Sequence, residues 1–219
     1  ALLAFAFLVL RPAPRPVVQS QPLELSSIGG PFTLTRSDGK PFVSSSLAGQ
    51  PYAIFFGFTH CPDVCPTTLA RIVRLRRQLG AGDRPFEILF VTVDPQRDGP
   101  AEVGKYADLF DSPVTGLTGS PAQIEQVKKQ FGIFSQQVQD GTGSYSVDHT
   151  ATVLLFDRQG EFIATIAPEE QDSAALAKLK RITGSARARE DDRSPPPQRA
   201  RQGPEHGRRR GRLRLRRRR

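Results

Sequence analysis

The feature that most constrains the fold is an alternation of strand patterns with helical patterns within residues 29–182. Residues 52–58 and 87–93 are apolar runs, which are typical of strands buried on both faces of a sheet. Each run is followed by apolar residues at helical spacing, in residues 66–79 and in residues 103–110. This alternation predicts an α/β domain whose sheet is covered by helices on both faces.

Antiparallel hairpins are predicted at both ends of this alternation. Residues 32–35 and 41–43 flank the letters SDGK, which form a turn signal. Residues 152–156 and 161–166 flank a second turn, DRQG, in the same way. Because parallel and antiparallel pairings are both expected, the sheet is predicted to be mixed.

Two more helices are predicted in the second half of the chain. Residues 120–123 read SPAQ, a capping box with proline at the first helical position. The helix that follows carries Ile124, Val127 and Phe131 on one stripe. Residues 173–182 form the closing helix, so we place the folded domain at residues 29–184.

The net charge of +9 is carried by the C-terminal end. Residues 185–219 hold fourteen arginines and four acidic residues, whereas residues 1–184 hold seventeen basic and eighteen acidic ones. The folded domain is therefore near neutral, and we expect no nucleic-acid partner for it. The tail, residues 185–219, is expected to be disordered. Its arginines fit either a tether to anionic lipid or nucleic acid, or an accident of the reading frame.

Residues 1–10 are an unbroken apolar run, followed by an arginine and a proline-rich stretch. Ten residues are too few to cross a bilayer, which takes about twenty. We expect the run to be the surviving end of a signal sequence or membrane anchor, with residues 1–28 forming this remnant and a linker. The alternative is a buried N-terminal strand.

The chain has two cysteines, Cys61 and Cys65, placed where the strand 52–58 gives way to the helix 66–79. Cys61 is expected near the helix N-terminus, where unpaired N–H groups stabilise a thiolate. The spacing alone leaves a redox pair, a metal site and a structural disulfide open. Two thiolates cannot complete a zinc or iron–sulfur site, which normally takes four ligands, whereas Cu(I) accepts fewer.

Residues 57–66 read GFTHCPDVCP, which resembles the signature of the SCO/SenC family of copper proteins. Residues 147–151, VDHTA, resemble the segment that carries the metal-binding histidine of that family. Three more segments resemble the family in the same order: GGPFTL at 29–34, VTVDPQRD at 91–98 and GLTG at 116–119. The resemblance spans the whole predicted domain and does not extend to the tail.

The resemblance implies a thioredoxin-like fold and copper, as Cu(I), Cu(II) or both, bound by Cys61, Cys65 and His149. It implies a metallochaperone rather than an enzyme, which helps to load the copper centre of cytochrome c oxidase subunit II. Other copper chaperones are further candidate partners. An N-terminal anchor in the inner membrane would leave the domain facing the periplasm, or the intermembrane space in a mitochondrion.

Several neighbours of this site have open roles. His60 is a rival ligand because it adjoins Cys61, although its side chain should leave the backbone in another direction. Asp148 is a candidate for orienting the ring of His149. Residues 136–147 are predicted to form a mobile hairpin, and the strand 152–156 is expected to be central in the sheet.

The main alternative function is a thiol–disulfide oxidoreductase that uses Cys61 and Cys65 to reduce the cysteines of the oxidase copper site. Against a pure oxidoreductase, Ala151 stands where thioredoxins carry a proline, and the spacing is CxxxC rather than CxxC. A peroxiredoxin is disfavoured because Phe58 and Ile54 replace that family's threonine and proline. A structural disulfide would add little stability across so short a loop.

Overall fold

The computed structural model describes residues 28–80, 84–139, 141 and 143–184. The predicted N-terminal remnant therefore lies outside the described residues, apart from Ile28, and so does the predicted tail at 185–219.

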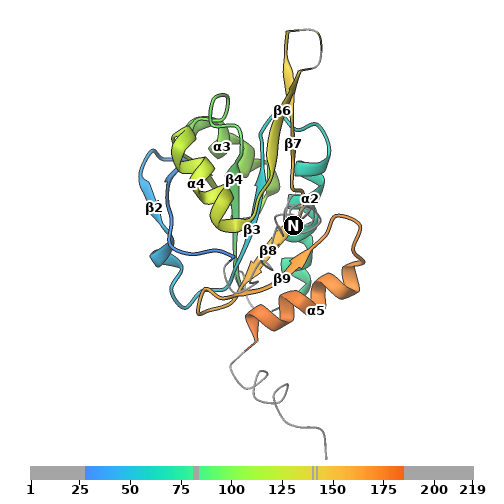
Figure 1. Ribbon diagram of the computed structural model, residues 1–219. Coiled ribbons are helices and arrows are strands. Elements are labelled where there is room, and N and C mark those ends of the chain that lie inside the picture. Colours follow the sequence, from blue (N-terminus) through green and yellow to red (C-terminus); the bar gives the residue numbers. More distant parts are fainter. Residues whose placement is uncertain (1–27, 81–83, 140, 142, 185–219) are drawn as a thin grey trace, which may run out of the picture. The chain divides into compact units, whose positions relative to one another are not determined.

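Seven strands of the described residues form one large mixed sheet in the order β2-β1-β5-β4-β3-β8-β9 (Figure 1). Their bounds are β1 (Thr33–Arg36), β2 (Pro41–Val43), β3 (Tyr52–Gly57), β4 (Glu87–Thr92), β5 (Thr115–Thr118), β8 (Val153–Phe156) and β9 (Phe162–Ile166). The neighbours β3, β4 and β5 are parallel, and the outer pairs are antiparallel. The predicted mixed sheet is confirmed.

The helices agree closely with those predicted from apolar spacing. They are α2 (Val64–Gln78), α3 (Pro100–Ala107), α4 (Pro121–Phe131) and α5 (Asp172–Thr183), with short 3-10 turns η2 (Ser44–Leu47) and η3 (Asp108–Phe110). The capping box of α4 is present in both halves: Ser120 Oγ accepts from Gln123 N, and the Gln123 side chain accepts from Ser120 N. These bonds satisfy donors that a helix N-terminus otherwise leaves unpaired.

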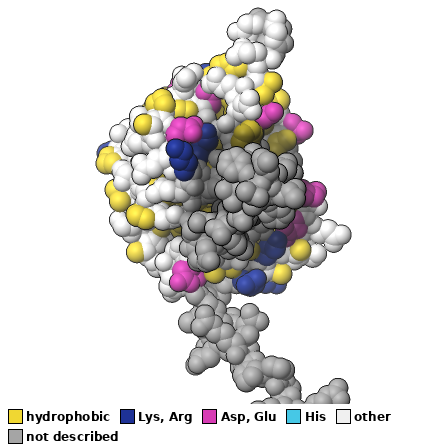
Figure 2. All heavy atoms as spheres, in the orientation of Figure 1, with side chains coloured by type: hydrophobic (Ala, Val, Ile, Leu, Met, Phe, Trp, Pro, Cys, Tyr) yellow, Lys and Arg dark blue, Asp and Glu magenta, His cyan; other side chains and the backbone are white. Residues whose placement is uncertain are grey.

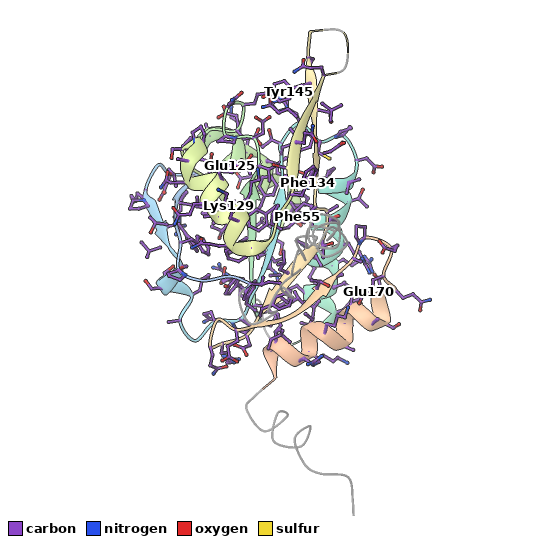
Figure 3. The ribbon with its side chains drawn as sticks, in the orientation of Figure 1. Phe55, Glu125, Lys129, Phe134, Tyr145 and Glu170 are labelled. Carbon is purple, nitrogen blue, oxygen red and sulfur yellow. The ribbon has the colours of Figure 1, made fainter. Side chains whose placement is uncertain are left out.

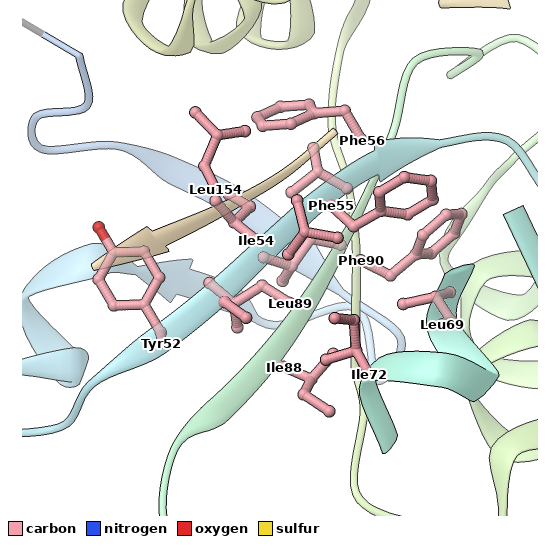
Figure 4. Packing of buried hydrophobic residues seen from close by; sticks show 14 of the residues in the cluster. Tyr52, Ile54, Phe55, Phe56, Leu69, Ile72, Ile88, Leu89, Phe90 and Leu154 are labelled. Atoms are coloured by element: carbon pink, nitrogen blue, oxygen red, sulfur yellow. The ribbon is translucent and has the colours of Figure 1, made fainter. Parts of the chain in front are cut away.

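Helices cover both faces of the sheet, because successive side chains of a strand point to opposite faces. Phe55 of β3 and Phe90 of β4 lie on the side of α2, as Figure 4 shows. Phe90 also packs on Tyr106 of α3, with ring centroids 4.8 Å apart. Phe56 points the other way and packs on Phe131 of α4 at 5.6 Å. The prediction of helices on both faces is therefore confirmed.

The strands β3 and β4 are almost completely buried, which explains why they read as continuous apolar runs. All six residues of β3 are buried, and so are five of the six residues of β4. Burial of one phenylalanine side chain contributes roughly 1.5–3 kcal/mol to stability. The two strands thus form a rigid support for the loops that leave their carboxyl ends.

Two features of the sheet differ from the sequence analysis. The strand β8 is interior but second from the edge, between β3 and β9, so the expectation of a central place is wrong. The strand β5 escapes prediction because its four residues include Gly116, and glycine weakens a strand pattern. Glycine is required there, since a Cβ would lie 2.4 Å from the carbonyl oxygen of Val103 in α3.

The strands β6 (Ser135–Gln139) and β7 (Tyr145–His149) form a separate two-stranded antiparallel sheet. We call this pair the arm; Figure 1 shows that it extends beyond the end of the large sheet. Ser135 pairs with His149 at the base, and Gln139 pairs with Tyr145 at the outer end. The hairpin predicted over residues 136–147 is confirmed, and its mobility stays a prediction.

None of the helices in the described part of the chain combines the length and the apolar character needed to cross a bilayer. On the face drawn in Figure 2, basic and acidic side chains are interspersed with apolar ones.

Gly116→Ala should lower the free energy of unfolding by about 3 kcal/mol, the upper part of the range for overpacking, because the methyl group overlaps backbone on α3. Urea denaturation measures the loss. Gly132→Ala is the control: a Cβ there meets nothing within 4 Å, and only the left-handed backbone (φ 66°) penalises alanine, by about 1 kcal/mol. Equal losses in the two variants would contradict the packing account.

Candidate metal centre

Two cysteines and one histidine converge at the end of the sheet where β3 gives way to α2. The donor atoms of Cys61, Cys65 and His149 all lie within 4.8 Å of one another. Cys65 Sγ and His149 Nε2 lie 3.3 Å apart. Sequence analysis singled out these three residues, and the fold brings them together.

The turn before α2 shapes the cysteine pair. Asp63 occupies the N-cap position, and the N–H of Cys65, in the first turn of the helix, donates to Cys61 Sγ at 3.4 Å. Cys61 is half-buried, whereas Cys65 is completely buried. The bond shows that the N-terminus of α2 points at the sulfur of Cys61, as the sequence predicts.

Gly57, the last residue of β3, leaves the space that Cys65 fills. A Cβ at Gly57 would lie 2.8 Å from Cys65 Sγ and about equally close to the rings of Phe55 and Phe90, at 3.0 and 3.1 Å. The glycine in the GFTHC segment is therefore a packing requirement of the buried sulfur.

Burial raises the pKa of the Cys65 thiol far above its usual range, and Cys61 adds to this through its hydrogen bond and charge. A hydrogen bond that the sulfur accepts from the Phe58 backbone lowers the pKa, but this effect is smaller than that of burial. Cys65 therefore carries its proton at neutral pH. A metal ion that binds the sulfur must displace that proton.

The ring of His149 is oriented by a backbone carbonyl. Its Nδ1 lies 3.0 Å from the oxygen of Thr150, which can only accept, so Nδ1 carries the proton. The neutral ring then turns the lone pair of Nε2 toward Cys65. The candidate Asp148 is exposed and acts on His149 only through its charge, so the oriented hydrogen bond belongs to Thr150 instead.

Aromatic rings hold the imidazole edge-on from two sides. The centroid of the His149 ring lies 6.0 Å from that of Phe55 and 5.8 Å from that of Phe58, at interplanar angles of 73° and 89°. Burial lowers the pKa of His149 below its ordinary value, against smaller opposing effects of Thr150 and Asp148. The ring is thus neutral and available as a ligand at pH 7.

The rival ligand His60 points elsewhere. Its side chain is 54% exposed, and its Nδ1 is bonded to Thr59 Oγ1 at 3.1 Å and lies 3.6 Å from Asp98. It is not a member of the three-residue cluster. Asp98 is buried and accepts from Thr59 N, Thr59 Oγ1 and Thr92 Oγ1, which fixes the loop that leads to Cys61.

The roles of Arg97 and Tyr145 escape the sequence analysis. Arg97 donates to the carbonyl of Tyr145 at 2.9 Å and pairs with Asp94, to which Tyr145 also donates at 3.0 Å. A signal was available: three charged residues follow the buried strand β4 directly, within VTVDPQRD. Tyr145, the partner of Arg97 on the arm, lies 48 residues further along the chain, and no local pattern reveals the pairing.

The donor set suits a soft metal ion. Thiolate sulfur and imidazole nitrogen favour Cu(I) or Zn, and among the described residues this cluster offers three ligands rather than the four of a closed zinc site. Cys65 lies in the first turn of α2 and His149 is the last residue of β7, whereas Cys61 lies in the loop before α2.

The fold and the site together define a thioredoxin-like domain with a CxxxC pair facing a histidine. The chain belongs to the SCO1/SenC family, whose model matches residues 20–184. This confirms the resemblance that the sequence motifs indicate.

Named relatives carry the same domain. The chain is 34% identical over 157 residues to "Protein SCO2, mitochondrial" of Saccharomyces cerevisiae, which covers 70% of this chain and 52% of that protein. Bradyrhizobium japonicum ScoI with copper bound is 42% identical, covering 71% of this chain and 99% of that one, with a TM-score of 0.65. Arabidopsis thaliana ScoI with copper bound is 30% identical, covering 70% and 99%, with a TM-score of 0.64. The chain spans about half the length of the curated relatives that it matches.

The stability of the metal-free domain should depend on pH through His149. Its folded pKa is lowered, so the unfolded chain takes up the proton first as the pH drops below about 6.5. The free energy of unfolding then falls, by at most about 1.4 kcal/mol per pH unit from this group, until the pH passes the folded pKa.

Urea denaturation at a series of pH values, with wild type beside His149→Gln, isolates this contribution. The variant should lack that part of the slope. Parallel pH curves for the two proteins would mean that His149 is not held neutral by burial.

Proposed function

We propose that this chain is a copper metallochaperone that holds copper through Cys61, Cys65 and His149 and assists the assembly of cytochrome c oxidase. The observation that carries the proposal is the convergence of two sulfurs and one imidazole nitrogen within 4.8 Å. Two relatives whose structures contain copper support the choice of metal, since the match covers 99% of each of their chains.

In this function copper is cargo, and the protein's residues govern its entry and hold. The neutral His149 offers Nε2 without losing a proton, because its proton sits on Nδ1. Cys65 releases its proton as the ion arrives, so the affinity should decrease in acid. Cys61, the more exposed sulfur, is the natural first contact for incoming copper and the last for copper that leaves.

The target that we propose is the copper centre of cytochrome c oxidase subunit II, with other copper chaperones as candidate donors. The structural relative BsSco is a member of the Sco family of cytochrome c oxidase assembly proteins, which supports this kind of role. We further propose that residues 29–184 form the copper-binding domain. Residues 1–28 would tether it to the inner membrane, facing the periplasm or the mitochondrial intermembrane space. The apolar run at residues 1–10 supports the tether.

A thiol–disulfide reductase that prepares the oxidase cysteines is the second candidate. The closeness of the two sulfurs favours it, since the N–H of Cys65 donates to Cys61 Sγ and the half-buried Cys61 can be reached by a substrate disulfide. Both cysteines are free thiols in the structure. The two functions use the same sulfurs, and only copper binding needs His149.

His149→Ala should weaken Cu(I) binding on the order of 100-fold or more, since even residues that only hydrogen-bond to a ligand are worth 10–100-fold. Disulfide exchange by Cys61 and Cys65 should persist. Competition against a chromophoric Cu(I) chelator without oxygen measures the first, and reaction with oxidised glutathione measures the second.

His60→Ala is the matched control and should retain the wild-type affinity for Cu(I). Retained one-to-one binding in His149→Ala would reject the three-ligand site. A wild-type chain that exchanges disulfides but cannot hold Cu(I) against the chelator would favour the reductase.

A further inference from the structure

An ion pair within the loop after β4, between Arg97 and the buried Asp94, holds the arm through Tyr145. The hydroxyl of Tyr145, at the outer end of β7, donates to Asp94 at 3.0 Å. Arg97 pairs with the same carboxylate through Nε and donates from Nη1 to the carbonyl of Tyr145 at 2.9 Å. The side chain of Asp94 is fully buried, so this pair is shielded from the solvent that weakens surface ion pairs.

The guanidinium of Arg97 also lies near two aromatic rings. Its central carbon is 3.7 Å from the ring centroid of Tyr145 and 5.8 Å from that of Phe58. Both distances are within the range of a cation–π interaction. Phe58 in turn meets the ring of His149 edge-on at 5.8 Å. A continuous series of contacts therefore joins Arg97 to the imidazole.

The strand β7 gives a second connection to the same imidazole. Tyr145, Val147 and His149 occupy alternate positions and so share one face of β7. Val147 is buried in the core, between the anchored Tyr145 and the site. Figure 3 shows Tyr145 toward the outer end of the arm and Phe55, which contacts His149, near its base. A strand fixed at its outer end and middle restricts the residue at its inner end.

We propose that Arg97, together with Asp94 and Tyr145, is a positioning group that keeps His149 in place over Cys65. The inference rests on the proposed function, in which His149 is a copper ligand. A ligand that is in place for only a fraction of the time reduces the apparent affinity by that fraction. Arg97 thus sets how tightly and how long copper is held without touching it.

Arg97→Gln tests the proposal, first without metal. The amides of β6 and β7 should exchange hydrogen about tenfold faster than in wild type, while those of β3 and α2 are unchanged. With copper, the dissociation constant for Cu(I) should rise about tenfold, and transfer to a chelator should be faster. Arg84→Gln is the matched control, because Arg84 also pairs with an acidic residue three positions away but is 50% exposed. In this variant neither the hydrogen exchange of the arm nor the dissociation constant for Cu(I) should change.

Tyr145→Phe is the second variant, and it decides the question if Arg97→Gln does not fold. It removes only the hydroxyl bond to Asp94 and keeps the stacked ring, so both effects should be smaller, roughly threefold. In a His149→Ala background, Arg97→Gln should cause no further loss of Cu(I) affinity, because it acts through the imidazole.

Wild-type exchange of the arm in both variants, or fully additive losses of affinity, would overturn the proposal. If the proposed function fails instead, His149→Ala will keep the wild-type affinity for Cu(I). Hydrogen exchange of the arm without metal will still show whether Arg97 holds the arm in place.

Discussion

The contact between Cys65 Sγ and His149 Nε2 is the interaction on which the site depends. It joins residues 84 positions apart and therefore requires the whole path of the chain from α2 to the arm. Neighbouring residues hold both Cys65 and His149 in position. Gly57 leaves space for the sulfur, and the carbonyl of Thr150 orients the ring.

Burial gives this contact its chemical character. Without metal, Cys65 keeps its proton and His149 is neutral, so the enclosed site contains no unpaired charge from either residue. A metal cation that binds takes the place of the thiol proton. The negative charge of the resulting thiolate then compensates the positive charge of the ion. The rings of Phe55 and Phe58 beside His149 lower the local polarity, which strengthens these electrostatic effects.

Much of the fold follows from local patterns in the sequence, because helices and buried strands have distinct apolar periods. The position of Cys61 and Cys65 at a strand–helix junction follows in the same way. His149 was identified through the family resemblance alone, since nothing local marks it as a ligand. The hydrogen bond and ring contact between Arg97 and Tyr145 do not follow from the sequence, because they join distant segments whose pairing depends on tertiary packing. The same reason explains why the sequence could not locate β8 within the sheet.

The central claim is that two sulfurs and one imidazole nitrogen share a single ion. X-ray absorption spectroscopy of the chain loaded with one equivalent of Cu(I) without oxygen tests it most directly. The account predicts a three-coordinate copper with two sulfur neighbours, one nitrogen neighbour and the outer scattering of an imidazole ring. A shell of sulfur alone, or a nitrogen that persists after His149 is replaced, would contradict it.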